Sequence, residues 1–355
     1  GVYAASLDED NRISSVGDYA DAFPTSCPLP AGCPTNRQID SEFDSSTYSV
    51  FGSIDSDLSD RMTLSIGLRY ERWSANYDDV WTDINYLGPP NNRTCDEASI
   101  DCSPGDTMLG GHISLGFDVS DQWNTYLRAA RGFKAGGFNP SLAALQSGSP
   151  VLGPEFVDYD PEYLWNYELG LKGLWVDGAV KTDIAVFYMD RDAAQLSVSS
   201  QQVSGDPNSF VYVTYNGKAN SYGLEASGLW QISRSWEVHG ALGLLESEVE
   251  DTESTHMVSP DAVGRDLAHA PRYTLNVGAA WSSPAGWYGR VDLNAIDEFY
   301  FDISHNQKSE SYEVVNLRVG KQWANWDLAL WGRNIFEESY ATRGFYFANE
   351  PPWSD

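Results

Sequence analysis

Apolar and polar residues alternate with a period of two through much of the chain. In residues 62–71 every even-numbered side chain is apolar or aromatic, from Met62 to Tyr70, and every odd-numbered one is polar, charged or glycine. Residues 112–119, 236–244 and 271–281 show a similar pattern. Each segment predicts a β-strand with one apolar and one polar face. Because charge recurs on the polar faces, we expect a wet interior rather than the dry core of a soluble sandwich.

Short polar connections join these strands into hairpins. Turn-forming residues predict six of them, at Asp55–Asp60, Ser120–Gln122, Asp177–Gly178, Ser233–Ser235, Ser283–Gly286 and Ala324–Asn325. Tryptophan flanks most of these turns, at Trp123, Trp175, Trp230, Trp236, Trp281, Trp287, Trp323 and Trp326. If all six turns lie at one end of the protein, these rings form a single belt at a membrane–water interface.

Long connections separate the hairpins, at roughly 8–46, 74–107, 133–160, 191–209, 247–270 and 297–310. Short turns at one end and long loops at the other are typical of outer-membrane barrels. We therefore predict an all-β fold, a transmembrane antiparallel up-and-down β-barrel. Counting from the strand fragment at Tyr3 to the last strand, Asp327–Asn334, gives thirteen strands. Single-chain bacterial barrels have even strand numbers, so we expect a partial barrel whose closing strands lie outside residues 1–355 on both sides.

Composition excludes several other classes of protein. The sequence contains no apolar run near the ~18 residues that a membrane helix requires. Aromatic residues make up 13% of the chain, with 13 Trp and 20 Tyr, which favours interfacial aromatic girdles. With 51 acidic and 22 basic residues the net charge is −29. Because a phosphate backbone requires a basic surface, we expect no nucleic-acid partner.

Four cysteines form two pairs that are close in sequence, Cys27 with Cys33 and Cys95 with Cys102. Both pairs lie in segments rich in Pro, Asn and Asp. In an oxidising compartment such spacing predicts two local disulfides that close loops. A zinc site is the alternative, and the absence of a neighbouring histidine argues against it.

Several segments are similar to recurrent stretches of one protein family. They are Arg131–Asn139 (RGFKAGGFN), Asn166–Lys172, Ala219–Glu225, and Trp331–Phe336 followed by Tyr340–Gly344. In their order and spacing over nearly the whole chain, they resemble the barrels of TonB-dependent outer-membrane receptors. The resemblance implies a barrel of about 22 strands with an N-terminal plug domain. Residues 1–355 would then be the C-terminal portion of the barrel, without the plug, the first strands or the last strand.

The resemblance also implies a function in the bacterial outer membrane. It predicts an active transporter and receptor that binds a scarce or large nutrient at extracellular loops and imports it with TonB-supplied energy. A ferric siderophore is the first expectation, followed by a glycan, haem or cobalamin. Expected partners are outer-membrane lipid and lipopolysaccharide, and a TonB-type inner-membrane energy complex that acts through the missing N-terminal region. The alternative is a passive porin, or a surface-binding barrel without energy coupling.

No catalytic, cofactor or metal constellation is predicted, and we expect no enzyme activity. The five histidines are scattered without metal-ligand spacing, and His112 and His239 are predicted on interior faces. Asp8–Asp10 and Asp158–Asp160 contain clustered carboxylates of the kind that calcium prefers. Loop cations and aromatic rings are the candidate substrate contacts. They are Arg131, Lys134, Phe138, Arg343 and Tyr346, with Trp81, Tyr86, Tyr159, Phe299, Tyr300 and Phe345 as further loop aromatics.

Overall fold

The computed structural model describes residues 1–18, 34–83, 102–139, 157–201, 210–252 and 261–344. In these residues the chain forms fifteen strands and two sheets. The strands are β1 Val2–Asp18, β2 Pro34–Ser59, β3 Met62–Asp83, β4 Gly105–Ser120, β5 Trp123–Lys134, β6 Gly137–Phe138, β7 Asp158–Tyr159, β8 Glu162–Trp175, β9 Val180–Gln201, β10 Phe210–Gln231, β11 Trp236–Thr252, β12 Tyr273–Ser282, β13 Trp287–Ile296, β14 Tyr312–Trp323 and β15 Trp326–Gly332. Within these ranges no helix has the length and apolarity needed to cross a bilayer.

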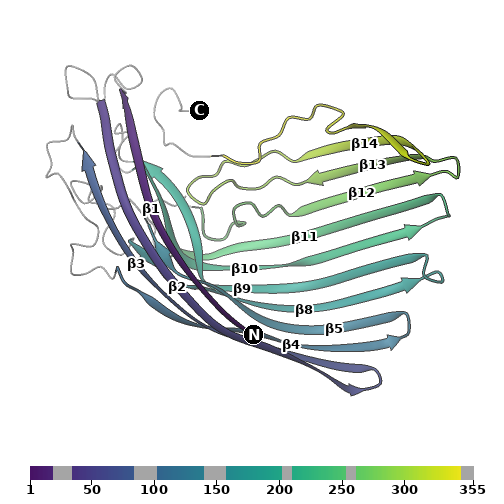
Figure 1. The fold of residues 1–355 in the computed structure, drawn as a ribbon, viewed down its shortest axis with the longest axis horizontal. Coiled ribbons are helices and arrows are strands. Elements are labelled where there is room, and N and C mark those ends of the chain that lie inside the picture. The colour runs from purple at the N-terminus through teal and green to yellow at the C-terminus, as the bar shows by residue number, and fades with distance from the viewer. Residues whose placement is uncertain (19–33, 84–101, 140–156, 202–209, 253–260, 345–355) are drawn as a thin grey trace.

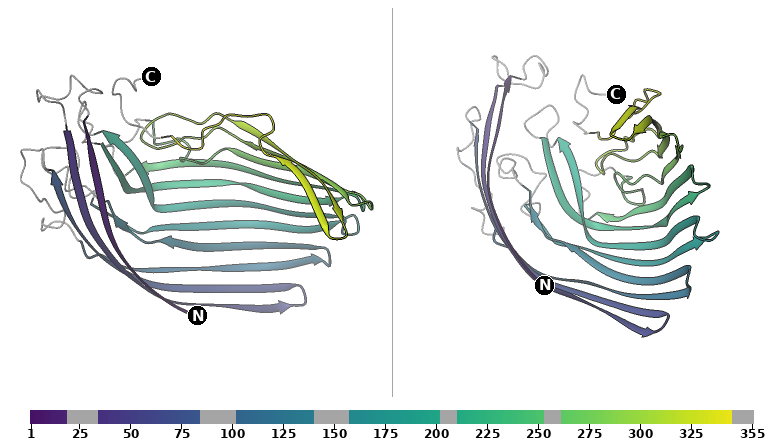
Figure 2. Two further views of the ribbon diagram at one scale, coloured as in Figure 1. Left: turned by 45° about the horizontal axis from the view of Figure 1, so that its top comes forward. Right: turned by 45° about the vertical axis from the view of Figure 1, so that its right-hand side comes forward.

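Thirteen of the strands form one antiparallel sheet in which each strand pairs with its neighbour in sequence. The order is β1-β2-β3-β4-β5-β8-β9-β10-β11-β12-β13-β14-β15, and β6 and β7 pair separately. The sheet curves into an open trough (Figures 1 and 2). The predicted up-and-down architecture and its thirteen strands are confirmed.

All six short turns lie at one end of the sheet, called here the turn end (Figure 1). The opposite end, where the longer connections lie, is the loop end. The turn between β2 and β3 is Asp60–Arg61, shorter than the predicted Asp55–Asp60, because β2 stays paired with β3 as far as Ser59. Pairing also continues at the loop end into segments that were predicted as loops. For example, Asp8 pairs with Asp44 and Asp10 with Glu42, so β1 reaches Asp18.

One register runs through the large sheet and separates two faces. Leu127 pairs with Leu115 on β4 and with Leu169 on β8, and Leu169 pairs with Val186 on β9. These side chains share the outer face and are exposed, Leu127 to 61%. The outer face therefore carries a continuous apolar band across neighbouring strands, as lipid requires. The inner face carries the alternating polar residues, including His112 and Arg290, in agreement with the sequence pattern.

Two aromatic girdles border the apolar band. The turn-end girdle contains the eight tryptophans predicted beside the turns, and all of them fall on the outer register. Three outward-facing tyrosines form the second girdle, nearer the loop end. Tyr167, Tyr222 and Tyr273 each lie eight residues before a tryptophan of the same strand, namely Trp175, Trp230 and Trp281. Eight residues span roughly 26 Å along a strand, and a barrel tilt of ~35–45° shortens this to about 20 Å. The girdles are thus spaced for a thin bilayer.

The outer register makes a stability prediction. Leu169→Arg places a charge in the middle of the apolar band and should destabilise the folded barrel in lipid by ~2–4 kcal/mol. Ala241→Arg on the inner face is the matched control and should change stability by less than about 1 kcal/mol, because the inner face is wet. The measurement is urea unfolding of the intact protein in lipid vesicles. Equal losses from the two variants would contradict the assignment of the faces.

Candidate functional site at the loop end

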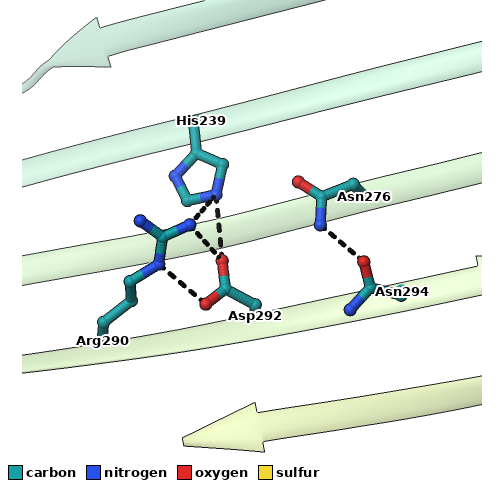
Figure 3. Close-up of polar contacts among 5 residues, drawn as sticks. All are labelled: His239, Asn276, Arg290, Asp292 and Asn294. Carbon is teal, nitrogen blue, oxygen red and sulfur yellow. Dashed lines mark hydrogen bonds and ion pairs between the residues drawn. The ribbon is translucent and has the colours of Figure 1, made fainter. Parts of the chain in front are cut away.

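Polar side chains on the inner wall are paired with one another. Figure 3 shows Arg290 donating to both carboxylate oxygens of Asp292, at 2.7 and 2.8 Å, while His239 Nε2 lies 3.0 Å from the same carboxylate. Beside them Asn276 Nδ2 donates to Asn294 Oδ1 at 2.8 Å. These residues come from β11, β12 and β13. On β11–β13 these polar groups of the inner wall are therefore paired with one another, which suits a lining.

A segment between β5 and β8 folds inward at the loop end and is called here the rim segment, residues 135–139. Its Gly137 and Phe138 form β6 and pair with Tyr159 and Asp158 of β7. The two glycines are required by this close approach. A Cβ on Gly136 would collide with the backbone carbonyl of Tyr159, and one on Gly137 would collide with the Tyr159 ring. These two glycines therefore permit tight backbone packing.

Two asparagine side chains attach this part of the chain to β10. The amide of Asn139 is 3% exposed; it donates to Thr214 O at 2.6 Å and accepts from Thr214 N–H at 2.7 Å. Asn216 accepts from Asp160 N–H at 2.7 Å and donates to Asp160 O at 3.0 Å. Each side chain thus reproduces a pair of backbone ladder bonds. These bonds hold the rim segment and residue 160 against β10.

A charged group on β8 reinforces the attachment. Glu162 accepts from Arg191 Nη1 at 3.0 Å and from the backbone N–H of Gln195 at 2.8 Å. Gln195 Nε2 in turn donates to Ala135 O at 2.8 Å and Asp160 O at 3.2 Å. The guanidinium and the carboxylate neutralise each other, and the glutamine ties the beginning of the rim segment to β9.

Phe138 connects the rim segment to the opposite wall. Its ring stacks on Tyr77 of β3, with centroids 5.0 Å apart, and meets Phe43 of β2 edge-on at 6.2 Å. It also packs against the buried apolar cluster of β9 and β10 that includes Val198 and Val213. The rim segment therefore spans from β2 and β3 to β10 and is fixed at both ends.

Two loops close over the same region and are called here the cap, residues 261–272 and 297–311. Arg265 joins them: Nη1 donates to His305 O at 2.8 Å, Nη2 donates to Asp302 O at 2.5 Å, and the guanidinium lies 4.2 Å from the Tyr300 ring centroid. The cap is also attached to the sheet, because Val249 N–H of β11 donates to Arg265 O. His305 is 9% exposed, and burial lowers the pKa of its imidazole; neighbouring Arg265 lowers it further and Asp302 opposes the shift.

The rim segment, the inner face of β9–β11 and the cap line a half-open cavity of about 970 Å³. Its apolar wall includes Leu196, Val198 and Val213, and its cap side includes Leu267 and Ile303. The size is in the range of small-molecule sites. Apolar walls with a few charged groups make this cavity suitable for binding rather than chemistry.

The structure brings only some of the predicted contact residues to this cavity. Phe138 and Arg343 line it. Lys134 ends β5 and is not among the lining residues. Arg131 falls on the outer register, where its guanidinium lies 4.1 Å from the Tyr163 ring centroid and its Nη1 donates to Leu109 O. Tyr346 lies outside the described residues.

The structure also places some of the loop aromatic residues, carboxylates and cysteines that the sequence singled out. Phe299 and Tyr300 belong to the cap, where Phe299 stands beside His269 and Phe301, and Tyr159 packs on Gly137. In the described residues no group of three or more carboxylate, His or Cys side chains is arranged to hold a metal ion, and this includes Asp8–Asp10.

Cys102 is disulfide-bonded. Its partner must be one of the other three cysteines, and Cys27, Cys33 and Cys95 all lie outside the described residues. The two predicted pairings therefore stay predictions.

Asn139, Asn216, Gln195 and Arg265 were missed by sequence reasoning. The first two act through bonds to backbone groups of distant residues, Asn139 to a residue 75 positions away. Such bonds leave no periodic pattern. The one available signal was the Gly-Gly-Phe-Asn sequence of the rim segment, in which a polar amide directly follows an aromatic residue at a strand end.

A curved antiparallel sheet with an apolar outer face, a polar inner wall and a half-open cavity at its loop end defines a membrane β-barrel of the ligand-binding type. The family model described as "TonB dependent receptor-like, beta-barrel" matches residues 3–335. The chain belongs to this family of TonB-dependent receptors, as the sequence motifs predicted. Its members are receptors and transporters rather than enzymes, which confirms the prediction that the chain is not an enzyme.

Individual relatives have low sequence identity to this chain. The pesticin receptor of Yersinia pestis is 25% identical over 252 residues, which cover 68% of this chain and 33% of that protein. The metal-pseudopaline receptor CntO of Pseudomonas aeruginosa is 21% identical over 286 residues, 78% of this chain and 35% of that protein. The crystal structure of the ferric yersiniabactin uptake receptor FyuA from Yersinia pestis has a TM-score of 0.72 at 20% identity, covering 97% of this chain and 47% of that one. The chain thus spans about a third of the curated relatives' length.

The asparagine bonds make a prediction about local stability. Asn139→Ala leaves the part-buried N–H and C=O of Thr214 without these two bonds, which costs ~1–3 kcal/mol. Amide hydrogen exchange in residues 137–139 and 157–160 should become faster, and mass spectrometry measures it. Asn220→Ala is the matched control, because Asn220 lies on the same strand and makes one exposed bond to Glu250. Unchanged exchange in the Asn139 variant would contradict the attachment of the rim segment.

The buried histidine makes the cap sensitive to pH. Because folding lowers the pKa of His305 below the ordinary 6.5, the open cap takes up a proton more readily than the closed cap. The contribution of His305 to closure is therefore complete above pH 6.5 and is lost as pH falls through its folded-state pKa. Exchange in residues 261–272 and 297–311, corrected for intrinsic rates, should rise below pH 6.5. His305→Gln should remove most of this dependence, and His269→Gln, at an exposed residue, should leave it.

Proposed function

We propose that the intact protein is an outer-membrane receptor that binds a ferric siderophore or a related metal chelate at its loop end. In this proposal it imports the chelate with energy from a TonB-type inner-membrane complex. The cavity lined by the rim segment, β9–β11 and the cap is the observation that carries the proposal. It lies on the inner side of the sheet and extends from the level of the tyrosine girdle toward the loop end, the side from which an external ligand would enter.

The relatives support the choice of substrate class. They are described as receptors for pesticin, metal-pseudopaline and ferric yersiniabactin. Two of these names contain a metal or its chelate. A glycan, haem or cobalamin remains the second expectation, because each is also too large for simple diffusion through a narrow pore. The cavity volume of about 970 Å³ accommodates a medium-sized chelate.

The proposal includes the parts of the protein beyond these residues. Residues 1–355 act as the C-terminal portion of the barrel, the outer face contacts lipid and lipopolysaccharide, and an N-terminal plug domain links the lumen to the TonB-type complex. The inner wall shown in Figure 3 is polar enough to face such a domain or water. A disulfide at Cys102 is consistent with an oxidising compartment.

Uptake of radioactive iron tests this function. Cells that express the intact protein and lack other iron receptors should accumulate iron from at least one member of a ferric siderophore panel, and loss of TonB should reduce that uptake to background. Continued uptake without TonB would favour the passive porin. Binding without any uptake would favour a surface-binding barrel, and failure of every chelate to bind or enter would overturn the proposal.

A further inference from the structure

Four polar ring side chains on the inner face of the sheet each lie opposite a glycine. The direct cross-strand pairs, with the ring named first, are His112 and Gly67, Tyr126 and Gly170, His239 and Gly278, and Tyr288 and Gly320. In each pair a Cβ added to the glycine would collide with the ring. The rings therefore lie over the glycine backbone instead of pointing into the barrel interior.

Two of these rings reach across a whole strand. His239 is on β11, and its Nε2 lies 3.0 Å from Asp292 Oδ1 on β13 (Figure 3), so the imidazole crosses β12 at the glycine. Tyr288 is on β13 and donates to Asp327 Oδ1 on β15 at 2.6 Å, so the phenol crosses β14 at the glycine. Strands two apart are separated by roughly 10 Å. Only side chains that lie along the wall meet across that distance.

Tyr126 provides an internal comparison, because it has a glycine on both sides. It pairs with Gly116 on β4 and with Gly170 on β8. Its hydroxyl donates to Glu168 Oε1 on β8 at 2.5 Å, so the ring leans toward β8 and covers Gly170. A Cβ on Gly116 would meet no atom of this ring within 4 Å. A methyl group at Gly170 therefore displaces the ring, whereas the same group at Gly116 leaves it in place.

A ring on the outer face shows that pairing with glycine does not by itself flatten a ring. Trp281 faces outward and pairs with Gly289. A Cβ on Gly289 would meet Val319 Cγ2 at 3.6 Å and Arg318 O at 3.8 Å, and no atom of the indole within 4 Å. The flat packing on the inner face therefore comes from the hydrogen bonds of the ring tips together with the space above the glycines.

We infer that the four ring–glycine pairs keep the inner wall flat, so that the contents of the barrel can move past it during transport. The inference rests on the proposed function, in which a plug domain and the chelate both move within the barrel. A ring that lies flat adds only its thickness to the wall. Its polar tip already bonds a wall residue, so it does not hold a passing group. The glycines are positioning residues, because each acts through the ring that covers it.

Gly170→Ala tests the inference through Tyr126. The methyl group forces the phenol off the wall, and the maximal rate of TonB-dependent iron uptake should fall by at least about threefold. The probe is the radioactive ferric siderophore of the panel that wild-type cells import. Its dissociation constant should stay within about twofold of the wild-type value, because Gly170 is not among the residues that line the cavity. Gly116→Ala is the matched control and should change neither quantity.

Removing the ring separates the width of the barrel interior from general strain. Gly170→Ala combined with Tyr126→Ser should regain most of the wild-type uptake rate, because the displaced phenol is gone. A variant that failed to fold would not be rescued by a second substitution that also removes the bond to Glu168. The amount of folded barrel in the outer membrane, measured from its heat-dependent shift in gel mobility, should be the same in all variants.

Two results would overturn the inference while the proposed function stands. They are uptake by Gly170→Ala at the wild-type rate, and a double variant that stays as slow as Gly170→Ala. A wild type that imports no ferric siderophore overturns the proposed function, and the inference falls with it. The wild-type uptake measurement therefore decides the function, and the comparison among variants decides the role of the flat wall.

Discussion

The structure depends on the backbone hydrogen-bond ladder that joins each strand to the next. In lipid no water is present to satisfy backbone groups, so every N–H and C=O in the membrane must find a partner in a neighbouring strand. The ladder fixes the register, and the register fixes which side chains face outward. Leu127, Leu169 and Val186 share the outer face because their backbones are paired. The apolar band, both girdles and the polar inner wall follow from this single constraint.

The parts of the fold that follow from local pattern could be predicted from sequence. Alternation between Met62 and Tyr70 identifies a strand and its two faces, because the period of two is a property of the extended backbone. The turns were recognisable from their Gly, Asp, Ser and Pro residues, and the flanking tryptophans gave their common side. Boundaries were less accurate at the loop end. Beyond the bilayer both faces of β1 and β2 meet water, so residues such as Asp8 and Asp44 stay paired without any alternation in polarity.

The candidate site could not be predicted in the same way, since it is built from contacts between distant segments. Phe138 was identified as an aromatic residue near a strand end, but its partners Tyr77 and Phe43 belong to strands that precede it by two hairpins. The side-chain amide of Asn139 bonds the backbone of Thr214 in the way that a neighbouring strand would, and no alternation in the sequence predicts such a bond. Arg131 was predicted as a substrate contact, but its register places it on the outer face of the sheet.

The acidity of the chain acts together with the cavity. The chain has a net charge of −29, and the outer register of β1 and β2 above the girdle places Asp8 beside Asp44 and Asp10 beside Glu42. A field of this sign lowers the local concentration of anions and the rate at which they associate, most strongly at low ionic strength. A neutral chelate is not slowed by it. The negative surface therefore acts at the stage of encounter, before a ligand reaches the cavity.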